Sequence, residues 1–301
     1  MPDATASNQP RVKAFLNKAG GSADDAKKAL EKAGLEVEEV PPEQLQSRLK
    51  RAVAEGSGRL LVGGGDGTIG TAAALVAGTQ TELAILPGGT LNHFAKDHGI
   101  PDDLAEATAV ALGGRVEGAD LGYMAESVFL NTSSIGAYVT FVRVRERFEK
   151  IFGYRIASFI ALLRMFSALR TFSVELEVDG QKKSYRTPLV FIGVGEREIQ
   201  PPHLGSRVPD GKRALHVMII RGRKPARLFA VALAGIARGV AHAKQLPEFD
   251  SFLVDRVTVD LMRPSTTIAL DGELKAHQSP FEYRIQRDAI RLVVPAPKRS
   301  E

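Results

Sequence analysis

The sequence predicts an α/β domain with a parallel sheet, followed by a mostly antiparallel, β-sandwich-like domain. Up to about residue 118, short apolar segments alternate with helical patterns, which is typical of βαβ units. These early strands lack strict polar alternation, as expected for strands covered on both faces. Later β segments are separated by turn signals such as Asp179-Gly180. We therefore expect domains at residues 9–118 and 119–297, and the last strand could return to the first sheet.

The expected elements of the first domain alternate after a lead-in, residues 1–10, for which we expect no structure. Strands are expected at Arg11–Leu16, Leu35–Val40, Arg59–Val62 and Glu82–Leu86. Helices are expected at Ser22–Ala33, Pro42–Glu55, Thr68–Ala77 and Asp102–Leu112. In such a domain the carboxyl ends of the strands lie on one edge of the sheet, where open α/β sheets bind their ligands.

The second domain is expected to be built from β segments interrupted by two helices. The β segments are Val128–Thr132, Phe172–Val178, Leu189–Val194, Ala214–Ile220, Val257–Leu261, Thr266–Asp271, Phe281–Gln286 and Ile290–Val294. The helices are Tyr154–Leu169 and Ala226–Gln245.

Composition is that of a globular protein without disulfides or thiolate metal sites. Of 301 residues, 44% are apolar and 25% charged, and there is no cysteine. The first residues, MPDATASNQPRVK, lack the apolar core of a signal peptide. The apolar stretch Leu228–Ala237 is shorter than the roughly 20 residues that span a bilayer. We expect a cytoplasmic protein, and its net charge of +5 could attract it to an anionic surface.

The most informative segment is RLLVGGGDGTIGT, residues 59–71, where an apolar strand meets an alanine-rich helix through a glycine cluster. Bare amides at a helix N-terminus form a site for phosphate. The segment matches G-x-G-x-x-G, but a dinucleotide-binding unit uses its first turn, with an acid about 20 residues later. Here the turn follows the third strand, and Thr90 stands near that place. A purely structural turn is the other alternative, although three consecutive glycines exceed what a turn requires.

Two further strand ends carry glycine-rich loops. Residues 85–96 read ILPGGTLNHFAK, and residues 17–21 read NKAGG. Because these loops and the first one share an edge of the expected sheet, they could together enclose a polyphosphate and its nucleoside.

VGGGDGT followed by LPGGTLNHFA resembles the catalytic domain of the diacylglycerol kinase family, which includes bacterial lipid kinases and sphingosine kinases. Asn17 with Gly20-Gly21 resembles the family's opening N-P-x-S-G loop, with Lys18 in place of proline. Asp120-Leu121-Gly122 and Asp271-Gly272-Glu273 resemble later landmarks in the same order, so the resemblance covers about residues 11–295. NAD kinases and phosphofructokinases share the G-G-D-G turn, but their acceptor motifs are not evident after Thr90.

The resemblance implies an ATP- and Mg²⁺-dependent lipid kinase of phospholipid biosynthesis, with its active site in a cleft between the domains. The acceptor would be a hydroxyl of diacylglycerol or a related lipid, reached by transient contact with the inner face of a membrane. Nucleic-acid binding is not expected, because basic patches with interleaved aromatic residues are absent. The residues expected to bind ATP are Asn17, Gly64, Gly65, Asp66, Gly67, Thr68, Gly89, Thr90 and Asn92.

Phosphoryl transfer needs positioned groups, charge neutralisation and a base for the acceptor hydroxyl. The resemblance gives Glu273 the role of proton acceptor. Asp66 is expected to hold Mg²⁺ or to orient the acceptor, with Asp120 and Asp271 in support. Each has a simpler alternative: Asp66 could cap a turn, Glu273 could be a solvated hairpin residue, and the two others could be ordinary turn aspartates.

Two further positions depart from the family pattern. Relatives often carry D-D-G before a strand as a structural metal site, whereas this chain has VPDGKR, leaving Asp210 as a weakened Mg²⁺ ligand. His93 stands where an acid is common. Two alternatives therefore stay open: a kinase for a soluble acceptor, as in NAD kinases, and a degenerate member that binds nucleotide and only regulates.

Residues 151–172 form a strongly apolar helical pattern with Arg155, Arg164 and Arg170 along it and further basic residues before it. This pattern fits either a core helix with snorkelling arginines or an element at a membrane interface. The basic stretch Arg221–Arg227 is either a solvated loop or an additional source of membrane attraction. The histidines show no ligand spacing, and the sequence does not indicate the oligomeric state.

Overall fold

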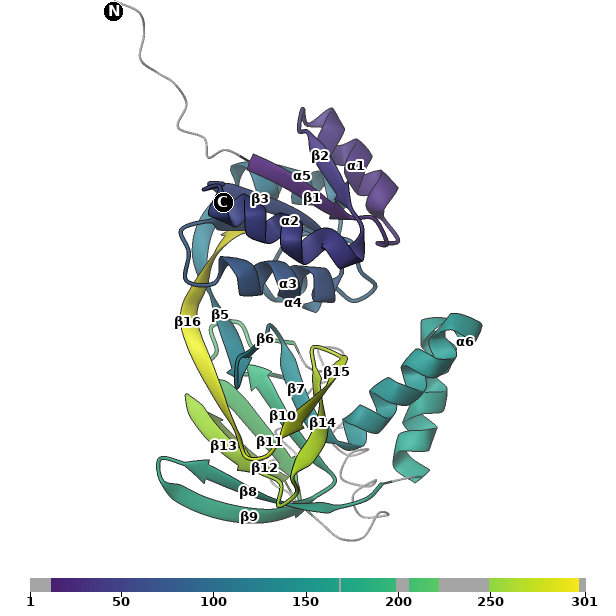
Figure 1. The fold of residues 1–301 in the computed structure, drawn as a ribbon, viewed down its shortest axis with the longest axis vertical. Coiled ribbons are helices and arrows are strands. Elements are labelled where there is room, and N and C mark those ends of the chain that lie inside the picture. Colours follow the sequence, from purple (N-terminus) through teal and green to yellow (C-terminus); the bar gives the residue numbers. More distant parts are fainter. Residues whose placement is uncertain (1–11, 168, 199–205, 222–248, 298–301) are drawn as a thin grey trace, which may run out of the picture. The chain divides into compact units, whose positions relative to one another are not determined.

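The computed structural model describes residues 12–167, 169–198, 206–221 and 249–297. The helix expected at residues 226–245, most of the basic stretch at 221–227 and the lead-in lie outside these residues. The chain divides into unit 1, residues 1–119 with 288–301, and unit 2, residues 120–287. Strands β5 (Arg115–Met124) and β16 (Phe281–Val294) each continue from one unit into the other (Figure 1).

Unit 1 contains the predicted parallel sheet, in the order β2-β1-β3-β4-β16. Its first strands are β1 (Val12–Asn17), β2 (Val37–Val40), β3 (Arg59–Gly64) and β4 (Glu82–Pro87). All of β3 is buried, as its apolar sequence predicts. The end of β16 runs parallel to β4, with Arg291 opposite Glu82.

The helices of unit 1 are α1 (Ala23–Lys32), α2 (Pro42–Ala54), α3 (Asp66–Val76), α4 (His93–Asp97) and α5 (Leu104–Gly113). α2 contacts α3 and α1 contacts α5, so helices cover both faces of the sheet (Figure 1). Register places Gly64 at the end of β3 opposite Pro87 at the end of β4. The strand ends that carry the glycine-rich loops therefore share one edge.

Unit 2 is a β domain of two antiparallel layers, which confirms the predicted fold class. One sheet has the order β12-β11-β10-β7-β14-β15, and the other contains β16-β13-β8-β9. Their inward apolar side chains form one core, which includes Ile192 and Val217 of the first sheet and Val259 and Tyr283 of the second. The strands are β6 (Ser127–Phe129), β7 (Thr132–Gly136), β8 (Phe172–Val178), β9 (Gln181–Thr187), β10 (Leu189–Val194), β11 (Leu215–Ile220), β12 (Phe249–Val254), β13 (Arg256–Asp260), β14 (Ser265–Leu270) and β15 (Glu273–Gln278).

Several details differ from the sequence prediction. The segment expected as one strand at 128–132 divides between β6 and β7, and the two segments expected at 281–294 form the single strand β16. β9 and β15 were not predicted, because both are polar strands at sheet edges and lack an apolar face.

The helix expected at 154–169 is the second arm of a longer element, α6 (Ala137–Ser167). Gly153, with φ 72° and ψ 166°, interrupts it, and the two arms form the helical hairpin in Figure 1. A positive φ is readily adopted by glycine, which explains why the reversal occurs at this residue.

Candidate functional site

The two main glycine turns of unit 1 pack backbone against backbone. The amide of Gly88 donates to the carbonyl of Gly64 at 2.9 Å. A Cβ at Gly89 would lie 2.8 Å from the Cα of Gly65, and a Cβ at Gly64 would lie 2.7 Å from the Thr68 side chain. These glycines are therefore required by packing alone, so their presence is not by itself proof of a ligand.

The N-terminus of α3 offers backbone donors without side-chain acceptors. Its N-cap is Gly65, which makes no side-chain capping bond. Gly67 in the first turn is exposed. The first amides of an α-helix have no intrahelical partner, and the helix dipole gives them partial positive charge. This turn can therefore accept an anionic group such as a phosphate.

The loop after β1 is tied to the α3 turn by side chains. Asn17 Nδ2 donates to Thr68 Oγ1 at 2.8 Å, and the Ala19 amide donates to Asn17 Oδ1 at 3.0 Å. Thr68 is buried. The structure thus brings Asn17 and Thr68 together and gives both a positioning role, while their contact with ATP stays a prediction. A Cβ at Gly21 would meet no atom within 4 Å, so packing does not require glycine there.

Asn92 shapes the second turn from inside. It is buried and has φ 50°. Its Oδ1 accepts from the Gly89 amide at 2.8 Å, and its Nδ2 donates to Asp102 at 3.2 Å. Thr90, by contrast, is exposed on the same turn. Of the three residues predicted here to contact nucleotide, Thr90 is exposed, Gly89 donates its amide to Asn92, and Asn92 holds the turn.

Asp66 caps the next helix across the two turns. Its carboxylate oxygens accept from the amides of His93 and Phe94, each at 3.3 Å. Asp66 therefore has the capping role that the simpler alternative assigns to it. The contact uses the backbone amide of His93, so it does not require an acidic side chain at position 93. The described residues contain no group of three or more His, Asp or Glu side chains arranged to hold a metal ion. Asp66 fits Mg²⁺ only in a site completed by phosphate oxygens and water, which is common for Mg²⁺.

In unit 2, Asp271 fixes the turn that precedes Glu273. Asp271 and Gly272, with φ 47° and 85°, form the two-residue loop between β14 and β15. The Asp271 carboxylate accepts from the amides of Leu130 at 2.6 Å, Asn131 at 2.8 Å and Thr132 at 2.9 Å. Hydrogen bonds to an ionised carboxylate are among the stronger ones in proteins. The loop is therefore anchored to the start of β7.

Glu273 is the first residue of β15, and its side chain is 59% exposed. Lys275 Nζ lies 3.6 Å from its Oε2, a long ion pair in solvent. The structure thus places Glu273 as an accessible carboxylate on a fixed turn. Its role as a base stays a prediction.

Asp120 is buried and surrounded by positive charge. It accepts from Arg207 Nη2 at 3.1 Å and from Arg213 Nε at 2.9 Å. Asp210 lies between them in sequence, exposed on a turn with φ 55°. Guanidinium groups therefore neutralise Asp120, and the described residues hold no group of three or more His, Asp or Glu side chains around Asp210.

Among the buried polar residues that sequence reasoning did not single out are Arg197 and Asn131 of unit 2. Arg197 is 3% exposed, its Nε donates to the Val194 carbonyl at 2.9 Å, and its amide donates to His216 Nδ1 at 3.0 Å. Asn131 is 4% exposed, and its Oδ1 has no protein hydrogen-bond partner. The signal for Asn131 was the polar run N-T-S-S that opens β7 in an otherwise apolar region.

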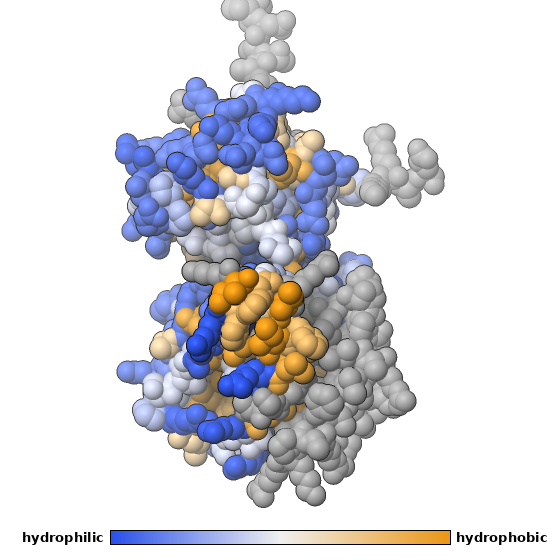
Figure 2. All heavy atoms as spheres, turned by 90° about the vertical axis from the view of Figure 1, so that its right-hand side faces the viewer, coloured by the Kyte–Doolittle hydropathy of each residue, from blue (hydrophilic) through white to orange (hydrophobic). Residues whose placement is uncertain are grey.

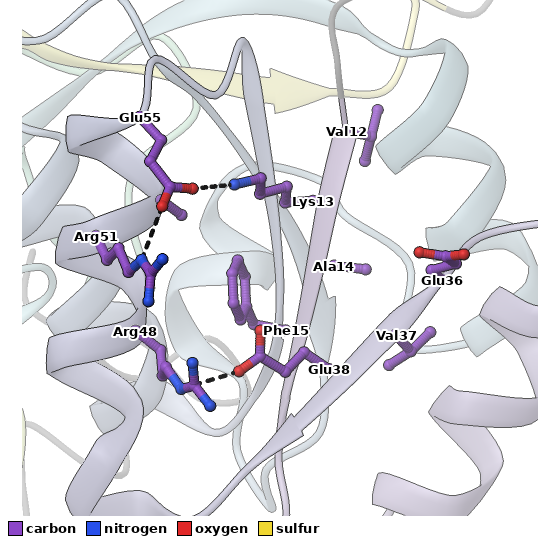
Figure 3. Close-up of a pocket in the computed structure, with 11 residues that line it drawn as sticks. Val12, Lys13, Ala14, Phe15, Glu36, Val37, Glu38, Arg48, Arg51 and Glu55 are labelled. Atoms are coloured by element: carbon purple, nitrogen blue, oxygen red, sulfur yellow. Dashed lines mark hydrogen bonds and ion pairs between the residues drawn. The ribbon is translucent and has the colours of Figure 1, made fainter.

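A hollow of about 510 Å³ in unit 1 is not part of this candidate site. Its lining includes Val12 and Lys13 at the start of β1, at the opposite end of the strand from Asn17 (Figure 3). Charged side chains in its wall already pair with one another: Glu55 Oε2 with Lys13 at 2.6 Å and Glu55 Oε1 with Arg51 at 2.7 Å.

Residues 11–124 match the model of the diacylglycerol kinase catalytic domain. A protein of Pseudomonas putida named "Probable lipid kinase YegS-like" is 38% identical over 154 residues, 50% of each chain. A diacylglycerol kinase of Mycobacterium tuberculosis is 31% identical over 45% of each chain, and one of Staphylococcus carnosus is 26% identical over 73% of this chain and 74% of its own. The chain thus spans about half the length of most of these curated relatives.

A crystal structure of a diacylglycerol kinase from Bacillus anthracis superposes with a TM-score of 0.68 at 17% identity, covering 97% of this chain and 98% of the other. At this identity the likeness shows the fold. The resemblance inferred from the glycine-rich turns is confirmed, because both turns lie within the matched segment and the relatives carry the names of lipid or diacylglycerol kinases.

Proposed function

We propose that this chain is an ATP- and Mg²⁺-dependent lipid kinase that phosphorylates a hydroxyl of diacylglycerol or a related lipid. The observation that carries the proposal is the uncapped N-terminus of α3, which lies in a turn packed against a second glycine turn. Both turns belong to the segment that matches the diacylglycerol kinase catalytic domain. The lipid acceptor implies transient contact with a membrane and a place in phospholipid biosynthesis.

In the proposed complex, unit 1 binds the nucleotide mainly through backbone. The first-turn amides of α3 donate to phosphate oxygens, and the exposed Thr90 adds a hydroxyl. Asn17, Thr68 and Asn92 hold the loops at fixed positions, so little ordering is left for the moment of binding. Asp66, together with phosphate oxygens and water, would hold Mg²⁺, which neutralises charge on the phosphates.

Unit 2 supplies the base in the proposed reaction. The acceptor hydroxyl oxygen forms a bond to the γ-phosphorus, its proton passes to the Glu273 carboxylate, and the bond between the γ-phosphorus and the β,γ-bridging oxygen breaks to leave ADP. Asp271 keeps Glu273 in place through the turn between β14 and β15. Because Glu273 is exposed, it can then release the proton to water.

A kinase assay with labelled ATP tests the proposal against the alternatives. The purified full chain is supplied with Mg²⁺ and with either vesicles containing diacylglycerol or soluble acceptors, including NAD. We expect labelled phosphatidic acid and no labelled soluble product. Turnover only with a soluble acceptor would overturn the lipid assignment. ATP binding in a calorimeter without any turnover would leave a nucleotide-binding regulator, and absence of ATP binding would overturn the whole proposal.

A further inference from the structure

The second arm of α6 presents large apolar side chains to solvent. Figure 2 shows them as a continuous hydrophobic patch over this hairpin. Monomeric proteins seldom leave such a cluster uncovered without a binding role. The exposed residues and their exposed fractions are Ile151 69%, Phe152 48%, Ile156 54%, Phe159 62%, Leu162 37% and Leu163 56%.

The same arm buries its small residues instead. Ala157 and Ala161 are both 0% exposed, and they lie on the helix face opposite Phe159 and Leu163. A helix selected only to pack in a core would turn the large side chains inward, since each gains roughly 1.5–3 kcal/mol on burial. The arrangement therefore contradicts the core-helix alternative drawn from the sequence and favours an interfacial element.

The charge of α6 indicates what covers this face. The helix carries six basic residues, Arg143, Arg145, Arg147, Lys150, Arg155 and Arg164, against two acids, Glu146 and Glu149. Arg143, Arg147 and Arg164 are exposed. Apolar side chains combined with an excess of basic residues are typical of helices that lie in the headgroup region of anionic bilayers. No helix among the described residues is long and apolar enough to cross a membrane.

The first arm of α6 connects this face to the candidate base. Val139 and Val142 pack on Ala269 of β14, together with Tyr138, Phe141 and Leu274. Leu274 follows Glu273 directly in β15. A bilayer bound to the second arm would therefore be connected, through the first arm, to the hairpin that carries Glu273.

We propose that the apolar face of the second arm of α6 docks the protein on an anionic lipid bilayer. This inference rests on the proposed function in one respect, because a lipid acceptor requires membrane contact. The docking itself is measurable without any turnover.

Co-sedimentation with vesicles tests it. The vesicles are phosphatidylcholine alone or mixed with phosphatidylglycerol, and the proteins are the wild type, Phe152→Ser/Phe159→Ser, and the control Met262→Ser. Met262 is 70% exposed but lies outside α6. We expect binding to the anionic vesicles, at least about tenfold weaker for the double variant because two apolar side chains no longer insert, and unchanged for the control. Circular dichroism checks that each variant is folded.

Further readouts separate the remaining outcomes. Equal vesicle binding by the double variant and the wild type would overturn the proposal. So would a wild-type dimer in lipid-free sedimentation that the double variant abolishes, because the face would then cover a second copy. If the chain docks through α6 but phosphorylates no lipid, the proposed function fails and the docking surface stands. If both hold, the double variant loses activity on vesicles and keeps it on a detergent-solubilised short-chain acceptor.

Discussion

The two units build their candidate groups in opposite ways. In unit 1 the groups proposed to contact the nucleotide are backbone amides, and the nearby side chains mostly hold loops in place. In unit 2 the proposed base is a side chain, Glu273, and the carboxylates Asp120 and Asp271 are anchored by donors far away in sequence. Under the proposed function, this difference would separate nucleotide binding in unit 1 from proton transfer in unit 2. Changes in unit 1 should alter ATP affinity and loop packing, whereas changes in unit 2 should alter the transfer step.

The largest effect is expected for Glu273→Gln. Loss of a positioned base should lower kcat by about 10²–10⁴-fold. The KM for ATP and the melting temperature should stay unchanged, because the side chain is 59% exposed and belongs to unit 2. Steady-state kinetics and thermal melts check this, with Glu282→Gln as the control carboxylate of the same unit. A fully active Glu273→Gln enzyme would remove the base assignment.

Asp66→Asn distinguishes the capping role of this residue from its proposed role as a charged Mg²⁺ ligand. Asparagine keeps one oxygen that can accept from His93 or Phe94, so we expect a stability loss of about 1 kcal/mol or less. If the carboxylate also holds Mg²⁺, kcat should fall by about 10²-fold, and half-maximal activity should require more Mg²⁺. A Mg²⁺ titration of the activity gives the answer. Normal activity with a normal titration would reduce Asp66 to a cap.

Asp271→Ala tests whether long-range anchoring holds unit 2's site. It removes the acceptor for three amides, so the free energy of unfolding should fall by about 2–4 kcal/mol. Asp179→Ala is a matched control, because Asp179-Gly180 forms the same kind of two-residue turn with φ 50° and 76°. Denaturant unfolding should show a clearly larger loss for Asp271. Equal losses would mean that only the turn preference matters.

A smaller effect is expected where the two glycine turns of unit 1 meet. Gly89→Ala places a Cβ 2.8 Å from the Gly65 backbone, and we expect destabilisation of about 1–3 kcal/mol with weaker ATP binding. Gly70→Ala in α3 has open space around its Cβ and should be neutral or slightly stabilising. Calorimetric ATP titrations and melts compare the two. Unchanged ATP affinity in a folded Gly89→Ala protein would argue against a nucleotide at this turn.

The smallest effect is expected for Glu55, which lines the hollow near the start of β1, away from the glycine turns of unit 1. Hydrogen bonds from Lys13 and Arg51 lower the pKa of Glu55 to about 2. Because the folded pKa lies below the ordinary 4.5, the pair stabilises the fold above about pH 4.5, and this contribution is lost as the pH falls toward 2. The melting difference between wild type and Glu55→Gln should therefore shrink with acid, while ATP affinity stays unchanged at neutral pH. Glu36→Gln, in the wall of the same hollow, is the control.

Sequence reasoning worked best where structure is decided locally. β1, β3 and β4 lie within two residues of their predicted bounds, because apolar runs between glycine turns determine them. α4 escaped prediction, since it has five residues and starts after a left-handed Asn92. β9 and β15 escaped because edge strands need no apolar face.

In the candidate site, too, local features could be predicted from the sequence and long-range contacts could not. The glycine turns could be recognised from the sequence, but their mutual packing could not, and it offers a second reason for the glycines. The partners of Asp120 and Asp271 lie 87 to 141 residues away, beyond any local pattern. The orientation of α6 was equally hidden, since its composition suits both a core and an interface.

The sheet of unit 1 is completed by β16, a strand near the end of the described chain. Arg291 of β16 stands opposite Glu82 of β4 and also bonds to it at 3.2 Å, although 209 residues separate them. A nascent chain that has emerged only as far as α5 therefore holds β4 with one unpaired edge, which is a template for association with other chains. The order of synthesis and the order of strands differ here, so this edge of β4 stays unpaired until the last strand of the sheet is made.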